Sequence, residues 1–352
     1  MTKLLLDLGF NDFFDGQLPK YGIGHPYRIA EDYGRRFTVI GVTDDGVREF
    51  DLVFSRDCTR APIVGDWIVA LPVDGRTVEY IDTLERKSCF SRATQNGELQ
   101  ALAANVDRLF VVTTCTSEFN LSRLERYLVL AKASNVEPVV VLNKVDLVAG
   151  DNVYAQEIAS ELGSGVAVCS TSTVFDDGME QLRAMIGPGE TCVFVGSSGV
   201  GKSSIVNELT DTDRQKTLGV SAKGARGSHT TTSRSLFRLP GGGLVIDTPG
   251  IRSVGVAAQG DELNDTFEDI ASLQSQCAFR DCRHEEEAGC AVMLAVDEGR
   301  LSMRRLNSYK KLQREITFFE DPDAARRQQR SDRRKMAANR ISREKLERKS
   351  RH

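Results

Sequence analysis

Short runs of apolar residues separated by tight turns dominate the first 95 residues of the chain. Two of these runs flank Asp44-Asp45-Gly46, a turn sequence that predicts a β-hairpin. Several short strands joined in this way favour a small β-barrel, which we predict for residues 1–95. The predicted strands lie at 37–42, 47–53, 66–71 and 77–81.

A basic stretch ends this region. Residues 86–92 place three cations beside Phe90. An aromatic ring among cations would suit base stacking and phosphate contact. An ordinary basic linker is an equally good interpretation.

Buried strands alternate with amphipathic helices from about residue 105. Asn120 can cap a helix whose apolar residues recur every three or four positions. The alternation predicts a parallel, doubly wound α/β sheet within residues 96–255. Residues 236–239 and 244–247 are predicted to form an antiparallel pair. The other predicted strands lie at 109–113, 138–142, 166–169 and 191–195, with further helices at 153–162 and 176–186.

The C-terminal part divides into a helical domain, 256–322, and a basic tail, 323–352. Apolar residues of the last predicted helix recur at Leu306, Tyr309, Leu312, Ile316 and Phe319. The tail has 12 Lys or Arg against 4 Asp or Glu, a charge of +8. Since the 352-residue chain carries −4, residues 1–322 carry −12. Cationic tails often contact nucleic acid, although many are only solvated.

The apolar runs are all too short for a membrane span, which needs roughly 18 residues. Residues 1–10 lack the long apolar core of a signal peptide. We therefore expect a cytoplasmic protein with no membrane contact, and a monomer.

A glycine-rich segment follows the predicted strand 191–195 and opens into a helix. Its spacing is that of a P-loop, whose backbone N–H groups cradle phosphate. Lys202 would reach the β- and γ-phosphates and Ser203 would ligate Mg²⁺. A glycine-rich helix cap is the alternative interpretation. The segment comprises Gly196, Ser197, Ser198, Gly199, Val200, Gly201, Lys202 and Ser203, with Ser204 next in the helix.

A second motif, Asn143-Lys144-Val145-Asp146, follows the strand 138–142, at the edge where such sheets bind ligands. The Asp146 carboxylate can accept from both N–H donors of guanine, and adenine offers neither. That mismatch should cost several kcal/mol, on the order of a thousandfold. Asn143 would tie the loops together, Lys144 would cover the base, and Ser170 would close the pocket. A polar turn is the alternative for these four residues alone.

Asp247-Thr248-Pro249-Gly250 ends another predicted strand. Asp247 would hold Mg²⁺ through water, and the Gly250 N–H would sense the γ-phosphate. Thr231 is our candidate for completing the Mg²⁺ shell. Ile251, the residue after Gly250, cannot orient the water that attacks the γ-phosphate. His229 is therefore the candidate for positioning or deprotonating this water. A surface histidine is the alternative.

The order of these motifs is circularly permuted, because the guanine motif precedes the P-loop. Chain termini that lie close together can be joined and the chain reopened elsewhere without changing the fold. The new opening falls after residues 247–250, so the predicted γ-phosphate sensor leads directly into the C-terminal region. Loss of the γ-phosphate should therefore be transmitted there.

A cysteine–histidine cluster lies in the predicted helical domain. Three thiolates and one imidazole can close a tetrahedral structural Zn²⁺ site with no open position. Reduced cysteines without a ligand are the alternative, whereas the other five cysteines are best explained as small buried apolar residues. The cluster consists of Cys277, Cys282, His284 and Cys290.

Together these motifs resemble those of the RsgA family of circularly permuted GTPases. The resemblance covers about residues 35–320 and includes Val64-Gly65-Asp66-Trp67 in the first domain. Ser228 stands where the family commonly has arginine, and Ala288 where it commonly has proline. The main motifs that carry the resemblance are residues 143–146, 196–203, 229–232, 247–250 and 277–292.

The resemblance implies an OB-fold first domain that binds RNA, a permuted GTPase domain and a C-terminal zinc domain. It implies that the protein hydrolyses GTP slowly by itself and faster on the small ribosomal subunit, and that it leaves the subunit after hydrolysis. Ribosomal RNA as the partner agrees with the cationic tail. A GTP-switched RNA-binding scaffold with negligible turnover is the rival function, and an ATP-using enzyme is disfavoured by Asn143 and Asp146.

Overall fold

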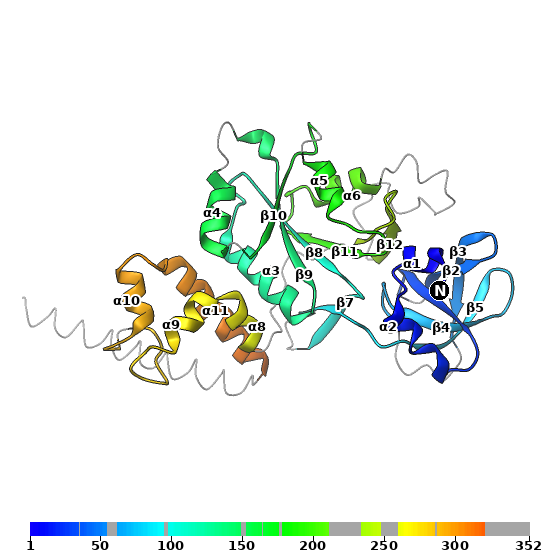
Figure 1. The fold of residues 1–352 in the computed structure, drawn as a ribbon, viewed down its shortest axis with the longest axis horizontal. Coiled ribbons are helices and arrows are strands. Elements are labelled where there is room, and N and C mark those ends of the chain that lie inside the picture. The colour runs from blue at the N-terminus through cyan, green and yellow to red at the C-terminus, as the bar shows by residue number, and fades with distance from the viewer. Residues whose placement is uncertain are drawn as a thin grey trace, which may run out of the picture. The chain divides into compact units, whose positions relative to one another are not determined.

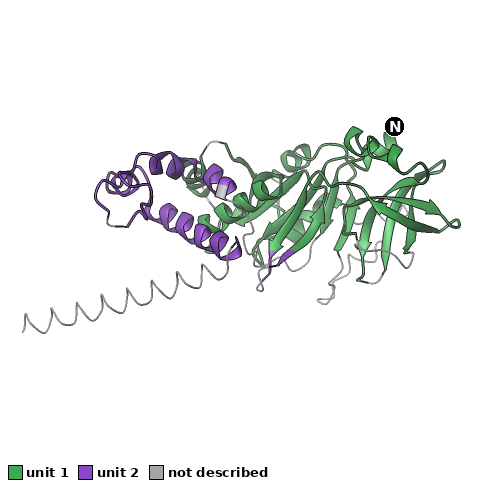
Figure 2. Ribbon diagram, turned by 90° about the horizontal axis from the view of Figure 1, so that it is seen from below, with its two compact units in different colours: residues 1–92, 100–254 green, residues 93–99, 255–352 purple. Residues whose placement is uncertain are grey.

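The computed structural model describes most of the chain as two compact units. One unit comprises residues 1–92 and 100–254, and the other residues 93–99 and 255–352 (Figure 2). No helix among the described residues is both long and apolar enough to cross a membrane. The described residues are 1–34, 36–54, 62–94, 98–148, 153–163, 165–175, 178–210, 234–247, 260–285 and 287–320.

The first unit begins with a closed β-barrel, as the hydrophobic pattern predicts. The strands follow the order β1-β2-β3-β5-β4, and β4 pairs back with β1. The predicted hairpin joins β2 to β3, with Thr43 opposite Gly46. Closure leaves no unpaired sheet edge within the barrel. The strands are β1 (His25–Asp32), β2 (Phe37–Thr43), β3 (Gly46–Val53), β4 (Trp67–Pro72) and β5 (Thr77–Thr83).

Short N-terminal helices pack on the barrel. Phe10 and Phe14 are buried beside Trp67, with ring centroids 4.8 and 6.0 Å from the indole. Such aromatic contacts add to the apolar area that the helices bury. These elements are α1 (Lys3–Asp7), α2 (Asp12–Asp15) and the 3-10 turn η1 (Leu18–Lys20).

Phe90 and Arg86 of the basic stretch 86–92 are engaged in contacts within the protein. It leads into β6 (Cys89–Ala93), which pairs with β7 (Leu99–Ala104). Phe90 is fully buried, so its ring cannot stack on a base. The Arg86 guanidinium is paired with the Asp66 carboxylate through bonds of 2.7 and 2.8 Å. The stacking interpretation of this stretch is therefore wrong for Phe90.

The predicted parallel α/β sheet is confirmed. Strands β10, β9, β8, β11 and β13 lie in that order and are parallel, and β12 pairs antiparallel with β13 (Figure 1). The strands are β8 (Arg108–Thr114), β9 (Glu137–Asn143), β10 (Ala167–Thr171), β11 (Thr191–Gly196), β12 (Arg234–Arg238) and β13 (Leu244–Asp247). The helices are α3 (Leu121–Ala133), α4 (Val153–Leu162), α5 (Met179–Ala184) and α6 (Lys202–Thr210), with the turn η2 (Val145–Leu147).

Both faces of this sheet are covered because strand side chains alternate in direction. On one face, residues of β8, β9 and β11 form a buried cluster with α5 and α6. Helix α3 packs against β8 and β9 on the opposite side (Figure 1). Asn120 caps α3 as predicted, since its side chain accepts from the Arg123 N–H at 2.9 Å.

The barrel and the parallel sheet are continuous in the first unit. Strand β1 pairs with β12, and Glu31 lies opposite Ser235. Arg28 of β1 is fully buried and donates to the Leu8 carbonyl at 2.5 Å and to the Thr191 hydroxyl at 2.7 Å. Burial lowers the pKa of Arg28 to about 10, and the nearby carboxylates of Asp107 and Asp66 oppose this. The side chain thus stays charged at neutral pH.

The second unit is helical over its described C-terminal residues. The predicted apolar face of α11 is buried at Leu306, Tyr309, Leu312 and Ile316. Arg305 holds α11 to α9 through bonds of 2.7 and 2.8 Å to Asp269. The helices are α8 (Gly260–Thr266), α9 (Glu268–Gln274), α10 (Ala291–Asp297) and α11 (Met303–Glu320). The domain boundaries predicted at 95, 255 and 322 stay predictions.

We expect Asp66→Ala to destabilise the first unit by about 3–5 kcal/mol, because Arg86 loses its partner at a site where its side chain is only 14% exposed. Urea unfolding measures the change. Asp45→Ala is the matched control, since it removes the exposed pair with Arg48, and should cost less than about 1 kcal/mol. Equal losses in the two variants would contradict a structural role for the buried pair.

Candidate nucleotide site and metal centre

The sheet changes winding direction between β8 and β11. From β8 the sheet continues through β9 and β10 on one side, and through β11 and β13 on the other. Ligands of open α/β sheets bind beyond the carboxyl ends of the strands at such a point. The glycine-rich segment 196–203 follows β11 at this edge, and Asn143 ends the neighbouring β9.

The glycine-rich segment has the strand–loop–helix context that a P-loop requires. It runs from β11 to α6, and Gly196 and Gly199 have φ values of 143° and 80°. A Cβ on Gly196 would lie 2.3 Å from the Val112 carbonyl oxygen. Glycine is therefore needed at this position both for the backbone conformation and for the close approach of β8.

Lys202 lies across the first part of this loop. Its Nζ donates to the carbonyl oxygens of Gly196 at 2.9 Å and Ser197 at 2.5 Å. Ser203 and Ser204, in the first turn of α6, are exposed. A cation and a hydroxyl beside a turn rich in N–H groups form an arrangement that can hold phosphate and its metal ion.

Asp247 ends β13, the parallel neighbour of β11. The residue is exposed, yet desolvation of its carboxylate by the surrounding chain raises its pKa, and the Lys202 ammonium opposes that shift. The Asp247 carboxylate is therefore close enough to interact electrostatically with Lys202, as expected for two groups that would contact the same ligand.

The predicted guanine motif contacts the glycine-rich loop directly. The Asn143 side-chain amide donates to the Val200 carbonyl at 2.9 Å, and the Lys144 ammonium to the Gly199 carbonyl at 2.7 Å. Gly201 packs so closely that a Cβ there would lie 2.2 Å from the Asn143 amide nitrogen. The structure therefore brings together two motifs that the sequence separates by about fifty residues.

Two residues at the end of β10, Thr171 and Ser172, were not predicted from the sequence as parts of this site. The Thr171 hydroxyl donates to the side-chain amide oxygen of Asn143 at 3.2 Å, and the Ser172 hydroxyl donates to the Asp146 carboxylate at 2.6 Å. Both side chains are buried, so they fix the orientation of the two residues that would read the base. Ser170, the predicted contact, lies on β10 opposite Leu142 and is half-buried. Only the position just after β10 could have indicated Ser172.

Three predicted residues lie outside the described part of the chain. These are His229, Thr231 and Gly250. Their roles as water-positioning base, Mg²⁺ ligand and γ-phosphate sensor stay predictions.

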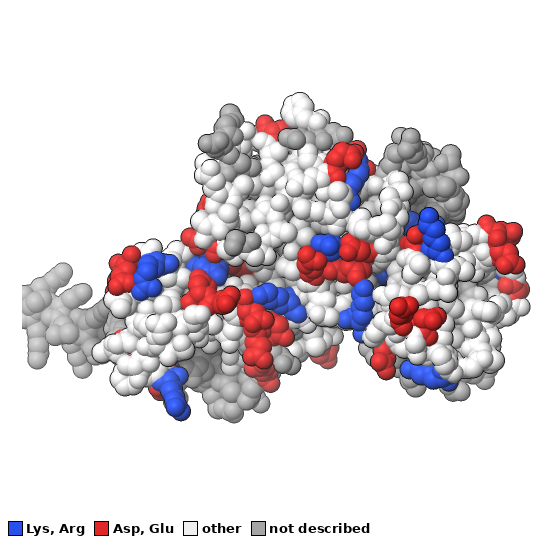
Figure 3. All heavy atoms as spheres, viewed as in Figure 1, with Lys and Arg blue, Asp and Glu red and all other residues white. Residues whose placement is uncertain are grey.

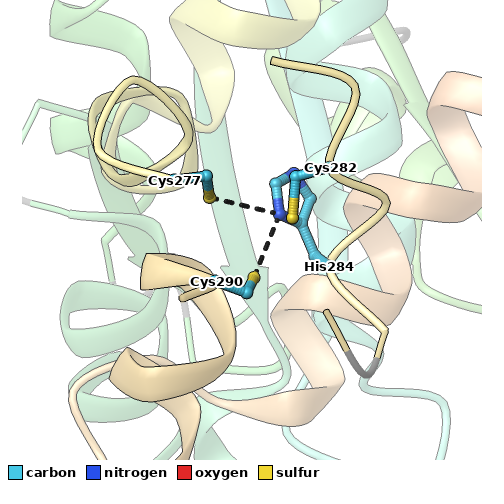
Figure 4. Close-up of side chains that lie close together, drawn as sticks. All are labelled: Cys277, Cys282, His284 and Cys290. Carbon is cyan, nitrogen blue, oxygen red and sulfur yellow. Dashed lines mark hydrogen bonds between the residues drawn. The ribbon is translucent and has the colours of Figure 1, made fainter. Parts of the chain in front are cut away.

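The cysteine–histidine cluster comes together in the second unit. Figure 4 shows Cys277, Cys282, His284 and Cys290 with their side chains converging on one point. Their ligand atoms all lie within 4.8 Å of one another. The His284 Nδ1 is 3.7 Å from the Cys277 sulfur and 3.4 Å from the Cys290 sulfur. A tetrahedral metal bound to one sulfur and one nitrogen would separate them by about 3.5 Å, so these residues fit a metal ion.

The surroundings of the cluster favour the ligand forms of Cys277 and His284, whereas desolvation raises the pKa of the Cys282 thiol to about 11. Desolvation raises the pKa of the Cys277 thiol, but the N–H groups of Ala291 and Val292 at the start of α10 outweigh it, so this pKa is lowered. Desolvation and Lys310 lower the pKa of His284, which keeps the imidazole neutral. Lys310 also donates to the His284 carbonyl at 2.6 Å. A thiolate and a neutral imidazole are the forms that bind metal.

The distribution of charged side chains on the surface bears on the predicted RNA binding. On the face in Figure 3, acidic and basic side chains of the described residues are interspersed. The strongly cationic segment of the sequence, 323–352, lies outside the described residues. The predicted RNA contact of the tail therefore stays a prediction.

Comparison with known proteins identifies the family. A model of the RsgA GTPase family matches residues 83–257. The small ribosomal subunit biogenesis GTPase RsgA 2 of Listeria monocytogenes is 39% identical over 312 residues, which are 88% of each chain. The chain belongs to the RsgA GTPase family. The RsgA of Streptomyces coelicolor is 41% identical over 281 residues, covering 78% of this chain and 76% of its own.

Solved RsgA-like structures have the same fold. YjeQ from Thermotoga maritima matches with a TM-score of 0.64 and 25% identity, over 84% of this chain and 99% of its own. YloQ, a circularly permuted GTPase, matches with a TM-score of 0.61 and 26% identity, over 84% and 96%. The permuted arrangement inferred from the motif order is thus confirmed.

We expect Asp146→Asn to weaken GTP binding by at least about a hundredfold and to favour xanthosine triphosphate, because an amide cannot accept from both guanine donors. Competition against a fluorescent GDP measures the change. Ser172→Ala, which removes only the bond to Asp146, should cost about tenfold or less. Retained preference for guanine in Asp146→Asn would contradict the base assignment.

We expect Cys282→Ser to lose the metal from the cluster, since the site would keep only three of its four ligands. Elemental analysis of the purified protein measures the metal content, and thermal unfolding its effect on stability. Cys89→Ser is the matched control, because Cys89 lies in β6, outside the cluster. Equal metal content in Cys282→Ser and the unchanged chain would exclude this site.

Proposed function

We propose that the chain binds GTP with its phosphates in the segment 196–203 and its guanine against Asn143 and Asp146. The observation that carries the proposal is the hydrogen bond from Asn143 to the Val200 carbonyl, 2.9 Å long. This bond makes the base-reading loop and the phosphate loop two sides of one site. Val145, Ser170 and Ser204 complete the proposed GTP contacts.

The proposed phosphate contacts follow from the chemistry of the loop. Lys202 neutralises the β- and γ-phosphates, and Ser203 ligates the Mg²⁺ that accompanies GTP. Asp247, whose carboxylate feels the charge of Lys202, holds this ion through water. Thr231 completes its shell, and the Gly250 N–H senses the γ-phosphate.

The proposed metal of the second unit is one structural zinc ion held by Cys277, Cys282, His284 and Cys290. Three thiolates and an imidazole are a common structural zinc set, and four protein ligands leave no position for water. The mutual distances of their ligand atoms, all within 4.8 Å, support this assignment. Zinc would fix the segment between α9 and α10, which has little regular structure of its own.

The proposed partner is the small ribosomal subunit with its rRNA. Support comes from the relatives, which are named small ribosomal subunit biogenesis GTPases. The tail of +8 would add salt-dependent affinity for a polyanion. In this proposal the subunit stimulates hydrolysis. The conformational change that follows loss of the γ-phosphate is transmitted from Gly250 to the following residues and releases the protein from the subunit. We propose a cytoplasmic monomer in this role.

Phosphate release with and without purified small subunits tests the proposal. We expect stimulation of at least about tenfold, which corresponds to about 1.4 kcal/mol of barrier. Purified large subunits are the control for nonspecific polyanion effects. GTP binding without any stimulation by small subunits would contradict the coupled reaction and favour a GTP-switched RNA-binding scaffold.

We expect His229→Ala to bind GTP normally and to lose roughly 10²- to 10⁴-fold in stimulated turnover, because the imidazole would position or deprotonate the attacking water. Single-turnover phosphate release on saturating small subunits measures the loss. His229→Gln separates the two roles, since an amide can orient water but cannot accept its proton at neutral pH. Unchanged turnover in both variants would remove His229 from the reaction.

A further inference from the structure

Helix α3 contacts the first two residues of the phosphate loop with two side chains. The Arg123 Nη1 donates to the Ser197 hydroxyl, and the backbone of Gly196 hydrogen-bonds the Tyr127 hydroxyl. Arg123 and Tyr127 are four residues apart, so they lie on the same face of the helix. Tyr127 is buried and is part of the packing, whereas the Arg123 side chain is 39% exposed.

Arg123 lies near the position where the β- and γ-phosphates would bind. Ser197 is contacted by two cations: the Lys202 ammonium binds its carbonyl at 2.5 Å, and Arg123 binds its hydroxyl. The guanine-reading loop instead contacts the far end of the segment, at Gly199 and Val200. Since the P-loop lysine reaches the β- and γ-phosphates, Arg123 belongs to the phosphate end of the site and not to the base end.

The guanidinium also has donors to spare. Its remaining contacts are long, a 3.5 Å hydrogen bond to the Glu118 carbonyl and a 3.9 Å ion pair with the Glu118 carboxylate, and both involve Nη1. Within the described residues, Nε and Nη2 have no hydrogen-bond partner. The Glu118 side chain is 58% exposed, so its charge is largely screened by water. A fixed guanidinium with unused donors beside a phosphate loop suits an anionic ligand.

We propose that Arg123 contacts the terminal phosphate of bound GTP and stabilises the negative charge that develops during hydrolysis. The role rests on the proposed binding of GTP at residues 196–203. The water oxygen bonds to the γ-phosphorus as the bond to the β–γ bridging oxygen breaks. GDP keeps the electron pair of that bond, and the proton of the water ends on phosphate. Arg123 takes no part in proton transfer and donates hydrogen bonds only.

The experiment compares ground-state and transition-state binding in Arg123→Ala and Arg123→Gln. Glutamine keeps a donor for the Ser197 hydroxyl but has no charge. In both variants we expect GDP affinity within about twofold of the unchanged chain, and a single-turnover rate lower by about 10- to 100-fold. Binding of GDP with aluminium fluoride, which mimics the transferring phosphoryl group, should weaken by a similar factor.

Two comparisons keep the outcome specific. Arg183→Ala removes an arginine of α5 that pairs with Glu180 and Glu208, away from the loop, and should change none of these quantities. Ser197→Ala removes the hydroxyl contact and should lower the rate by less than Arg123→Ala, because the charge stays. Arg123→Lys should recover part of the rate, since it restores a cation without the planar fork.

The proposal is overturned if Arg123→Gln hydrolyses GTP at the unchanged rate. It is equally overturned if GDP and the aluminium fluoride complex weaken by the same factor, because Arg123 would then only support the loop. Where Arg123→Ala unfolds, as seen by thermal melting, Arg123→Gln decides. Failure of the proposed function itself is distinct: the unchanged chain would then bind no guanine nucleotide.

Discussion

The site depends on the hydrogen bond between the Asn143 side chain and the Val200 carbonyl. It joins the end of β9 to the glycine-rich loop across 57 residues of sequence. Gly201 has no room for a side chain against Asn143, so glycine is needed there for the two segments to pack this closely. Thr171 and Ser172 then hold Asn143 and Asp146 from β10. The bonds of Asn143 to Val200 and Thr171 are buried, where a polar group without a partner would be costly, and the bond from Ser172 to Asp146 is partly buried.

The circular permutation leaves this arrangement intact because it changes only the connectivity. Strands β8, β9 and β11 bring their carboxyl ends to one edge whichever strand comes first in the chain. The connectivity matters after β13, the parallel neighbour of β11. Strand β13 ends at Asp247, and the chain continues from there to the helices of the second unit. The proposed γ-phosphate sensor would therefore have a covalent route to the proposed metal centre.

Burial of charge marks the junction between the barrel and the parallel sheet. Arg28 is fully buried in β1 and reaches the Thr191 hydroxyl at the start of β11, the strand that carries the glycine-rich loop. Asp66 is also buried, and Arg86 satisfies it. A charged group is costly to bury without a partner, so these residues favour the packing that brings their partners within reach. They thereby favour one arrangement of the barrel against the sheet. The glycine-rich loop thus follows a strand that is held by contacts from the barrel.

The sequence by itself determined the local features. The hairpin at residues 44–46, the Asn120 cap, the alternation of strands and helices over residues 109–210 and the glycine-rich loop follow from neighbouring residues, and the structure has them where the pattern places them. The four metal ligands were also recognisable, because their chemistry and close spacing leave few alternatives.

Tertiary structure decided what depends on distant residues. Strand β1 could not be predicted, because Pro26 and Arg28 interrupt its apolar pattern and Arg28 is stabilised only by partners far away in the chain. The sequence suggested that Phe90 could stack on a nucleic-acid base, but in the folded structure its ring is buried. Ser172 and Arg123 belong to no recognised motif, and they reach the site because β10 ends and α3 begins beside it. Local pattern fixes which elements form, whereas long-range packing fixes which side chains meet.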